Sequence, residues 1–440
     1  MSQNNRAYIL FAAVALLFVL EATTSGWIFS GSLNTSLAIL NMALVSAIMA
    51  LGVNLQWGYA GLFNTGIMGF VALGGLSVVL ISTPPVGEAW QAGGTQILIG
   101  LLIGAATVVG AIVARMMMPK GNARAIATWV ILIAGFFIYR AVFDAGVAKV
   151  EAINPSVSGN IGGLGLPVVV AWPVGGLLAA GAAYVIGKTA LGLRSDYLAI
   201  ATLGIAEILV AVLKNEEWLS RGVKNVNGLP RPVPYEVDLQ QSADFVAQAA
   251  SLGLDPTTAS TLYVKIGYAL LFTSVLVALL VLAQLALKSP WGRMMRAIRD
   301  NETAAEAMGK NVTLRHLQIF ILGSAICGVA GAMMTTLDGQ LTPTSYHPLR
   351  FTFLIWVMVI VGGSGNNFGS VLGGFLIWWL WIKVEPLGQW IAQVTTYGLP
   401  SDNWFAIRMT DAAAHMRLFT MGLVMLLVLR FSPRGLLPEK

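Results

Sequence analysis

Ionic side chains are concentrated in one run of this sequence, residues 288–315, which separates long apolar stretches. Three of its arginines recur at every third position, so on a helix they share one broad face. Residues of this type and spacing offer ionic docking rather than catalysis. The basic residues of the run are Lys288, Arg293, Arg296, Arg299, Lys310 and Arg315, and the acidic ones are Asp300, Glu302 and Glu306.

Capping signals divide the run into two short helices. Ser289 is a candidate N-cap, and Pro290 follows at the first helical position, where proline is favoured. A second helix is expected from Thr303, because Thr303 and Glu306 have the spacing of a capping box. Gly309 can end that helix in a left-handed cap.

Small side chains at Ala304, Ala305 and Ala307 leave the second helix thin, so another surface can approach it closely. One interpretation is a solvated cytoplasmic loop, since loops on that side of a membrane are rich in basic residues in any case. The other interpretation is a docking site for a partner protein, which the caps and the small-residue face favour.

Within this run, the sequence GRMMRAIRDNETAAEAMGKNVT resembles the coupling loop of bacterial ABC-importer permeases. The resemblance is greatest to the LivM-like branch of the branched-chain amino-acid transport family, in which the loop docks into a cleft on the ATPase subunit. It is also close at LRSDYLAIATLGIAEILVAVL, residues 193–213, and it covers 30–82 and 160–440. The resemblance implies that docking is carried by Arg293, Arg296, Glu302, Ala305 and Gly309.

Three polar residues inside apolar stretches are candidates for a substrate path. Glu207 lies within an apolar run, and an ionisable residue at membrane depth is functional by default, with a hydrogen-bonded packing residue as the alternative. Asn64 and Thr65 lie in a glycine-rich stretch, residues 58–75, which predicts a broken helix or close backbone approach. Broken helices often mark the substrate path of transporters.

The elements that must position these residues are membrane spans. With 57% hydrophobic and 10% charged residues, the chain is expected to be an all-α polytopic membrane protein with some broken or short helices. The strands of a β-barrel would alternate in polarity, and these runs do not. About twelve crossings are expected, because that many runs approach the ~20 residues that span a bilayer. They are 8–28, 34–55, 58–82, 95–115, 125–143, 167–187, 196–213, 262–287, 317–337, 350–362, 367–383 and 416–431.

The basic loops all fall on the cytoplasmic side if the N-terminus is inside. The same parity places the longer loops 214–261 and 384–415 outside. The glycine-rich segment 361–374 is expected to be a turn between two short spans. The apolar pair at 95–143 is interpreted as an extra hairpin, which leaves the remaining topology unchanged.

Other chemistries find no support in the sequence. Residues 182–189, AAYVIGKT, fit a loose phosphate-loop pattern, but they lie inside an apolar helical run rather than between a strand and a helix. Cys327 is expected in the core, and the three histidines lack metal-ligand spacing. Glu21 and Asp338 lie near span ends without an evident partner. No catalytic residue, metal, cofactor or nucleic-acid partner is therefore expected, despite a net charge of +6.

Residues 1–440 are thus expected to form one transmembrane permease domain that is no enzyme and has no nucleotide-binding site of its own. The resemblance implies a multi-pass subunit in the lipid bilayer of the bacterial inner membrane. It also implies two cytoplasmic ATPase subunits, a second related permease and a periplasmic substrate-binding protein. The implied cargo is a branched-chain amino acid or a related small polar solute, such as an amide or urea. The alternative is an ion-coupled secondary transporter or channel without ATPase subunits.

Overall fold

The computed structural model of the protein describes residues 3–26, 29–153, 159–400 and 403–439, and in these ranges the fold is almost entirely helical. The long helices are α1 (Gln3–Thr23), α2 (Leu33–Ala60), α3 (Ile67–Ser82), α5 (Thr95–Met117), α6 (Asn122–Glu151), α7 (Val168–Ala190), α8 (Ser195–Asn215), α12 (Pro256–Lys288), α15 (Val312–Asp338), α17 (Asn367–Thr395) and α18 (Trp404–Phe431). The shorter elements are α4 (Gly87–Ala89), η1 (Trp90–Gly94), α9 (Glu217–Ser220), η2 (Gly222–Lys224), β1 (Val226–Asn227), α10 (Glu236–Gln241), α11 (Ala243–Ser251), α13 (Pro290–Asp300), α14 (Glu302–Ala307), β2 (Gln340–Leu341), η3 (Pro343–Ser345), η4 (Leu349–Phe353) and α16 (Leu354–Gly362).

The described residues contain nine helices that are long and apolar enough to cross a membrane. A tenth candidate span is α18, which is bent by 60°, and two shorter apolar helices cover Ile67–Ser82 and Leu349–Gly362. These helices correspond one for one to the twelve predicted spans. The all-α polytopic prediction is therefore confirmed. Of the two spans expected to be short, the one at 350–362 is short, whereas α17, which includes 367–383, is 29 residues long.

The predicted span 58–82 begins too early. Helix α2 continues through Ala60, residues 61–66 have no regular structure, and α3 starts only at Ile67. A break was expected here, and the glycines allow it, but its position depends on contacts with distant helices. The predicted span 8–28 also ends too late, because α1 ends at Thr23; residues 27–28 lie outside the described ranges.

The predicted loop 384–415 is mostly helical, because α17 continues to Thr395 and α18 begins at Trp404. Its placement on the external side stays a prediction. In the structure Lys383 pairs with Glu21 at 2.6 Å, and Arg417 pairs with Glu385, so these charges are neutralised within the protein. Neutralised charges can remain on a membrane helix at a much lower desolvation cost.

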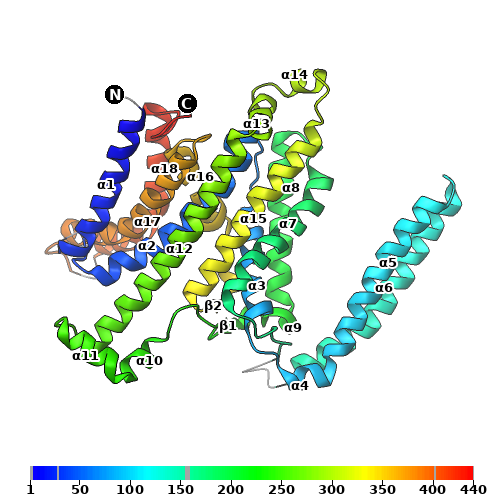
Figure 1. Cartoon of the computed structure of the whole chain (residues 1–440), viewed down its shortest axis with the longest axis horizontal. Coiled ribbons are helices and arrows are strands. Elements are labelled where there is room, and N and C mark those ends of the chain that lie inside the picture. The colour runs from blue at the N-terminus through cyan, green and yellow to red at the C-terminus, as the bar shows by residue number, and fades with distance from the viewer. Residues whose placement is uncertain (1–2, 27–28, 154–158, 401–402, 440) are drawn as a thin grey trace.

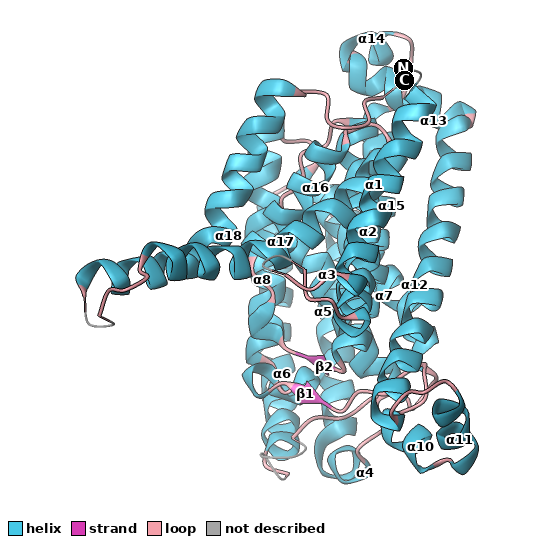
Figure 2. Cartoon of the chain, turned by 90° about the vertical axis from the view of Figure 1, so that its left-hand side faces the viewer, coloured by secondary structure: helices cyan, strands magenta, loops and turns pink. Residues whose placement is uncertain are grey.

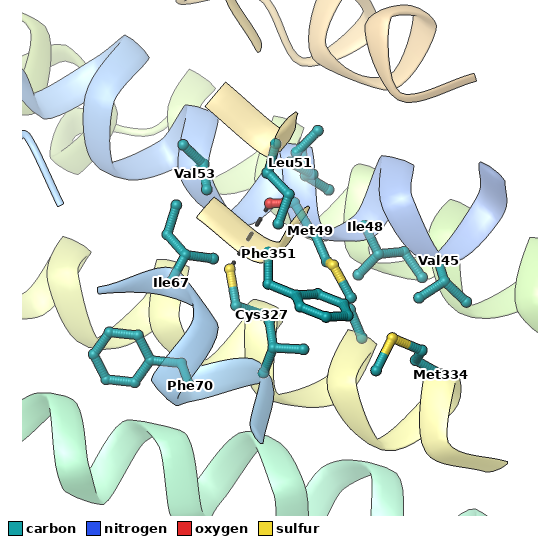
Figure 3. Packing of buried hydrophobic residues seen from close by; sticks show 14 of the residues in the cluster. Val45, Ile48, Met49, Leu51, Val53, Ile67, Phe70, Cys327, Met334 and Phe351 are labelled. Atoms are coloured by element: carbon teal, nitrogen blue, oxygen red, sulfur yellow. Dashed lines mark hydrogen bonds between the residues drawn. The ribbon is translucent and has the colours of Figure 1, made fainter. Parts of the chain in front are cut away.

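The core is formed by α2, α3, α15 and α17, around which the other spans pack (Figure 1). Figure 3 shows side chains of α2, α3, α15 and η4 interdigitating there. The prediction for Cys327 is confirmed: it is buried in this cluster, with its thiol 3.8 Å from the carbonyl oxygen of Met49. The turn predicted within 361–374 is also found, between α16 and α17.

Glycine makes the contact between α3 and α15 possible. A Cβ placed at Gly331 would overlap the carbonyl oxygen of Val71, and one at Gly74 would overlap that of Gly328. Membrane helices have little hydrophobic drive to associate, so close backbone packing of this kind contributes much of their attraction.

The α5–α6 hairpin stands away from the rest of the bundle (Figure 1). The two helices pack closely on each other, and a small cluster at one end attaches them to the body. In that cluster the Phe143 and Trp218 rings meet edge to face with centroids 5.5 Å apart. The predicted hairpin is present, and each of its helices leaves most of its apolar surface exposed.

The two ends of the molecule differ in structure. Helices α13 and α14 form one end, near the start of α1 and the end of α18 (Figures 1 and 2). At the opposite end, β1 pairs antiparallel with β2, and α10 and α11 form a helical cover (Figure 2). By the positive-inside rule the end with the basic run 288–315 is expected to be cytoplasmic and the opposite end external, which stays a prediction.

Candidate functional site

The basic run 288–315 folds as two helices joined at Asn301. Proline occupies the first turn of α13, and Ser289 has the extended backbone of an N-cap, but its hydroxyl donates to the Ala286 carbonyl instead of capping the helix. The second helix starts one residue earlier than predicted. Its N-cap is Asn301, whose side chain accepts a 2.9 Å hydrogen bond from the Ala304 amide, so the predicted capping box at Thr303 is wrong.

Helix α13 is amphipathic, and this sets the direction of its arginines. Met295 and Ile298 are buried against the body, whereas Arg293 is exposed and Arg296 half-exposed. The arginines line a cleft of about 740 Å³ together with Pro433, Arg434 and Glu439. Within the described chain, Arg296 makes no side-chain hydrogen bond or ion pair, so its guanidinium is free to pair with another protein.

The other predicted docking residues lie on α14 and just after it. Glu302 is exposed, and Gly309 is exposed with a φ of +75°, as a left-handed cap requires. Ala305 differs, because its side chain is buried in the main core cluster. Its small size lets α14 pack closely on the body of the protein, so its own surface is not presented to a partner.

The structure adds two residues to this site, Arg299 and Glu439. Arg299 ends α13 and pairs with Glu439 at 2.7 Å, and it also donates to the carbonyl oxygen of Gly58 at the end of α2. Burial lowers the pKa of Arg299, but its hydrogen bonds to Glu439 and Asp300 outweigh this and raise the pKa. The three-residue arginine spacing pointed to Arg299, whereas nothing in the sequence pointed to Glu439.

Asn64 holds the break between α2 and α3. Its side-chain amide donates 2.9 Å to Gln56, and its side-chain oxygen accepts from the Gly66 amide at 2.9 Å. The Asn64 carbonyl accepts from the Trp356 indole at 3.0 Å. Backbone groups of a broken helix must be satisfied inside the protein at membrane depth, and this network does so.

Thr65 is bonded just as completely. Its hydroxyl donates to the Ala199 carbonyl at 2.5 Å, and its amide donates to Thr202 at 3.2 Å, both on α8. Its carbonyl accepts from Thr352 of η4 at 3.2 Å. Asn64 and Thr65 are therefore brought together as buried clamps that join α2, α8 and η4, and contact with a solute stays a prediction.

Asn54 forms a second clamp one turn before the end of α2. Its side-chain oxygen accepts from the Gly365 amide at 2.9 Å, and its amide donates to Asn367 at 2.9 Å. A Cβ at Gly58 would overlap both Asn54 and Gly365, so glycine is required for α2 to approach the α16–α17 turn. The end of α2 is thus tied to the second interruption of the bundle.

Glu207 lies apart from these clamps, on the outward face of α8. Its side chain is exposed and makes no hydrogen bond or ion pair with the described residues. Its neighbour Ile208 and the residue two turns earlier, Ile200, are also exposed. A carboxylate on a lipid-facing surface is costly, so this face is expected to be covered or to line a wet cavity.

Glu21 was expected to lack a partner, and the structure corrects this. Its carboxylate pairs with Lys383 and accepts from the Ser30 hydroxyl at 2.6 Å, which joins α1 to α17. For Asp338 no hydrogen bond or ion pair to the described residues is found. The stretch 182–189 lies inside α7, so it has helical geometry rather than that of a phosphate loop. Among the described residues, no three His, Cys, Asp or Glu side chains are grouped to hold a metal.

A bundle of spans with broken helices and an arginine-bearing loop is the architecture expected of a polytopic transport permease. Residues 142–429 match the family described as "Branched-chain amino acid transport system / permease component". The chain belongs to this family, and it is a multi-pass protein of the bacterial inner membrane.

Relatives support the assignment over different lengths. The LivM permease of the Escherichia coli high-affinity branched-chain amino acid transport system is 30% identical over 47% of this chain and 48% of its own. A probable LivM permease from Methanocaldococcus jannaschii is 24% identical over 89% of this chain and 90% of its own. The ribose import permease RbsC of Haemophilus influenzae is 24% identical over 58% and 70%. The matched region thus spans about half of the Escherichia coli relative, and no solved structure matches.

Proposed function

We propose that this chain is the permease subunit of an ATP-driven importer. Its partners are two cytoplasmic ATPase subunits, a second related permease and a periplasmic substrate-binding protein. The ATPases dock on α13 and α14, and their closure shifts these helices and switches the bundle between outward-open and inward-open states. Arg293, Arg296, Glu302, Ala305 and Gly309 form the docking element, with Ala305 acting from within by seating α14.

The observation that carries the proposal is the amphipathic seating of α13. Its apolar side is buried in the protein and its arginine side lines an open cleft, so the helix is held firmly while it presents charge to the cytoplasm. A solvated loop that only fixes topology needs arginines but needs neither a buried face nor the Asn301 cap between its helices. A rigid element attached to a movable bundle is what an external motor requires.

Glu207 supports a second permease subunit. The exposed face of α8 carries a carboxylate that makes no hydrogen bond or ion pair with the described residues, and a neighbouring permease would remove it from lipid. We place the solute path along this covered face, with Glu207 on it. Asn64 and Thr65 contribute indirectly, because they fix the α2–α3 break against α8 from the other side.

The proposed cargo is a branched-chain amino acid or a related small polar solute, such as an amide or urea. Relatives named for branched-chain amino acids and for sugars match this chain, so the class of cargo rests on the family rather than on a bound ligand. Strand β1 and helices α10 and α11 lie within the predicted external loop 214–261, and β2, residues 340–341, pairs with β1. Together they are the surface proposed to receive the binding protein.

Arg296→Glu tests docking. We expect uptake to be lost while the amount of protein in the membrane stays normal, because the side chain makes no hydrogen bond or ion pair within the described chain. Lys310→Glu is the matched control: it reverses a charge in the same loop, outside the proposed docking set, and should retain most uptake. Normal uptake by the Arg296→Glu variant would exclude the docking role.

Glu207→Gln tests the path. The variant should change the uptake rate, and Glu207→Asp, which keeps the carboxylate, should change it less. An unchanged rate in the glutamine variant would leave Glu207 as a packing residue.

An ion-coupled transporter or channel is the alternative function, and purification from the native membrane distinguishes the two. Recovery of two ATPase chains and a second permease in stoichiometric amounts is expected. Recovery of this chain alone, with transport intact after reconstitution, would favour the alternative.

A further inference from the structure

The segment after α18 turns back over the α16–α17 turn. We call residues 432–439 the strap. The Leu436 amide donates to the Val361 carbonyl at 2.8 Å, and the Leu437 amide donates to the Gly362 carbonyl at 2.9 Å. These two carbonyls belong to the last turn of α16, where no intrahelical donor remains. The strap therefore caps the carboxyl end of α16.

The strap is seated too closely to be a loose tail. Leu437 is buried against α1 and α17. Gly363 has a φ of +119°, and a Cβ there would overlap the Leu437 carbonyl, so the backbones touch directly. The side-chain amide of Asn366 donates to the Pro438 carbonyl at 3.3 Å. A displacement of the α16–α17 turn thus moves the strap, and the reverse holds as well.

Glu439 connects the strap to α13. Its carboxylate pairs with Arg299 at 2.7 Å, and the two side chains are only 26% and 24% exposed. The same Arg299 nitrogen donates to the Gly58 carbonyl, three residues before the irregular segment 61–66. The Arg299 guanidinium therefore contacts the end of α2, beside the α2–α3 break, directly. It is connected to the α16–α17 turn through the strap.

We propose that the Arg299–Glu439 pair is a positioning latch that transmits movement of α13 to the two interruptions. The proposal rests on the proposed function, in which ATPase closure displaces α13. Helix α13 is joined to α12 through the non-helical Ser289, so the covalent connection alone transmits displacement poorly. The latch adds a polar connection at the opposite end of α13 to the buried apolar contacts of Met295 and Ile298. Arg299 and Glu439 touch no solute in this scheme; they act by holding α13, α2 and the α16–α17 turn together.

Glu439→Gln is the test, in the complete importer reconstituted with its ATPases and binding protein. Glutamine keeps the size of the side chain and leaves the backbone bonds of the strap intact, while it removes the charge. We expect normal assembly, and ATP hydrolysis that loaded binding protein still stimulates. The number of solute molecules imported per ATP should fall at least about five-fold, which is the lower end of the coupling typical between allosteric sites. Glu439→Asp, which keeps the carboxylate, should recover part of the loss.

Arg434→Gln is the matched control. Arg434 lines the same cleft, and its side chain makes no hydrogen bond or ion pair with the described residues, so its ratio of solute to ATP should stay normal. An unchanged ratio in Glu439→Gln would overturn the latch while leaving the proposed function intact. Failure of that variant to assemble with the ATPases would overturn it too, since the latch acts after docking. If the unaltered chain binds no ATPase, the proposed function itself fails.

Discussion

Removal of the buried Glu21 carboxylate should destabilise the fold strongly. Glu21 is 0% exposed and Lys383 8% exposed, and their 2.6 Å contact joins α1 to α17. The same carboxylate oxygen accepts from the Ser30 amide at 3.1 Å and from its hydroxyl. In Glu21→Gln the ammonium group of Lys383 loses its counter-ion in a place where water does not replace it.

The expected loss is large because the cost is that of an uncompensated buried charge. Breaking one side of a buried pair costs about 3–5 kcal/mol, whereas replacing both partners by apolar residues is often neutral or stabilising. Glu21→Leu combined with Lys383→Met should therefore recover most of the stability lost in Glu21→Gln. The exposed pair Lys224–Glu217, with side chains 42% and 31% exposed, serves as the control. Lys224→Gln should cost only about 0–1 kcal/mol, because water screens surface pairs.

The assay is unfolding of the purified chain by sodium dodecyl sulfate in mixed micelles, followed by loss of helical circular dichroism. The single variant should unfold at clearly lower detergent fraction than the unaltered chain, and the double variant close to it. A single variant within about 1 kcal/mol of the unaltered chain would refute the reasoning, since that is the size of a surface pair. A double variant as unstable as the single one would show that the contact is needed for geometry rather than for charge.

Three further outcomes are expected. Gly331→Val should prevent α3 from packing on α15 and strongly reduce the folded protein recovered in mild detergent, whereas Gly204→Val, at a glycine whose Cβ would meet nothing within 4 Å, should not. Asn64→Ala should cost roughly 2–6 kcal/mol in the same unfolding assay, because it leaves the Gly66 amide and the side-chain oxygen of Gln56 unpaired, at about 1–3 kcal/mol each. Trp218→Ala should free the α5–α6 hairpin at its attachment, seen as faster proteolysis near residue 153 with uptake largely retained.

Much of the fold was predictable from hydrophobicity. Each of the twelve predicted spans has a helix, because apolar runs of membrane length leave the backbone no other way to satisfy its hydrogen bonds. The position of the first break was not predictable. Helix α3 begins at Ile67 because Asn64 and Thr65 are held by α8 and α16, and such contacts are invisible in a single stretch of sequence.

The part of the candidate site that depends on residues close together in the sequence was predictable. Arg293 and Arg296 follow helical spacing, so their shared face could be read directly. The Arg299–Glu439 contact joins residues 140 positions apart, and the Lys383–Glu21 contact joins residues 362 apart. Neither contact was predicted, because the sequence around a charged residue does not indicate which distant residue pairs with it. The burial of Ala305 was missed for a related reason: a small residue fits equally well against a partner protein or against its own chain.

The bonding of segment 61–66 also sets the order in which the protein can be completed during synthesis. The segment leaves the ribosome early, but the hydroxyl that fixes Thr65 belongs to α8, and the indole that fixes Asn64 lies 292 residues later in the chain. Until α16 has been inserted, the break has unpaired backbone groups, which lipid cannot satisfy. The start of α3 therefore stays in water or with the insertion machinery until most of the chain has been made, and the first-made part of the core is among the last to reach its final structure.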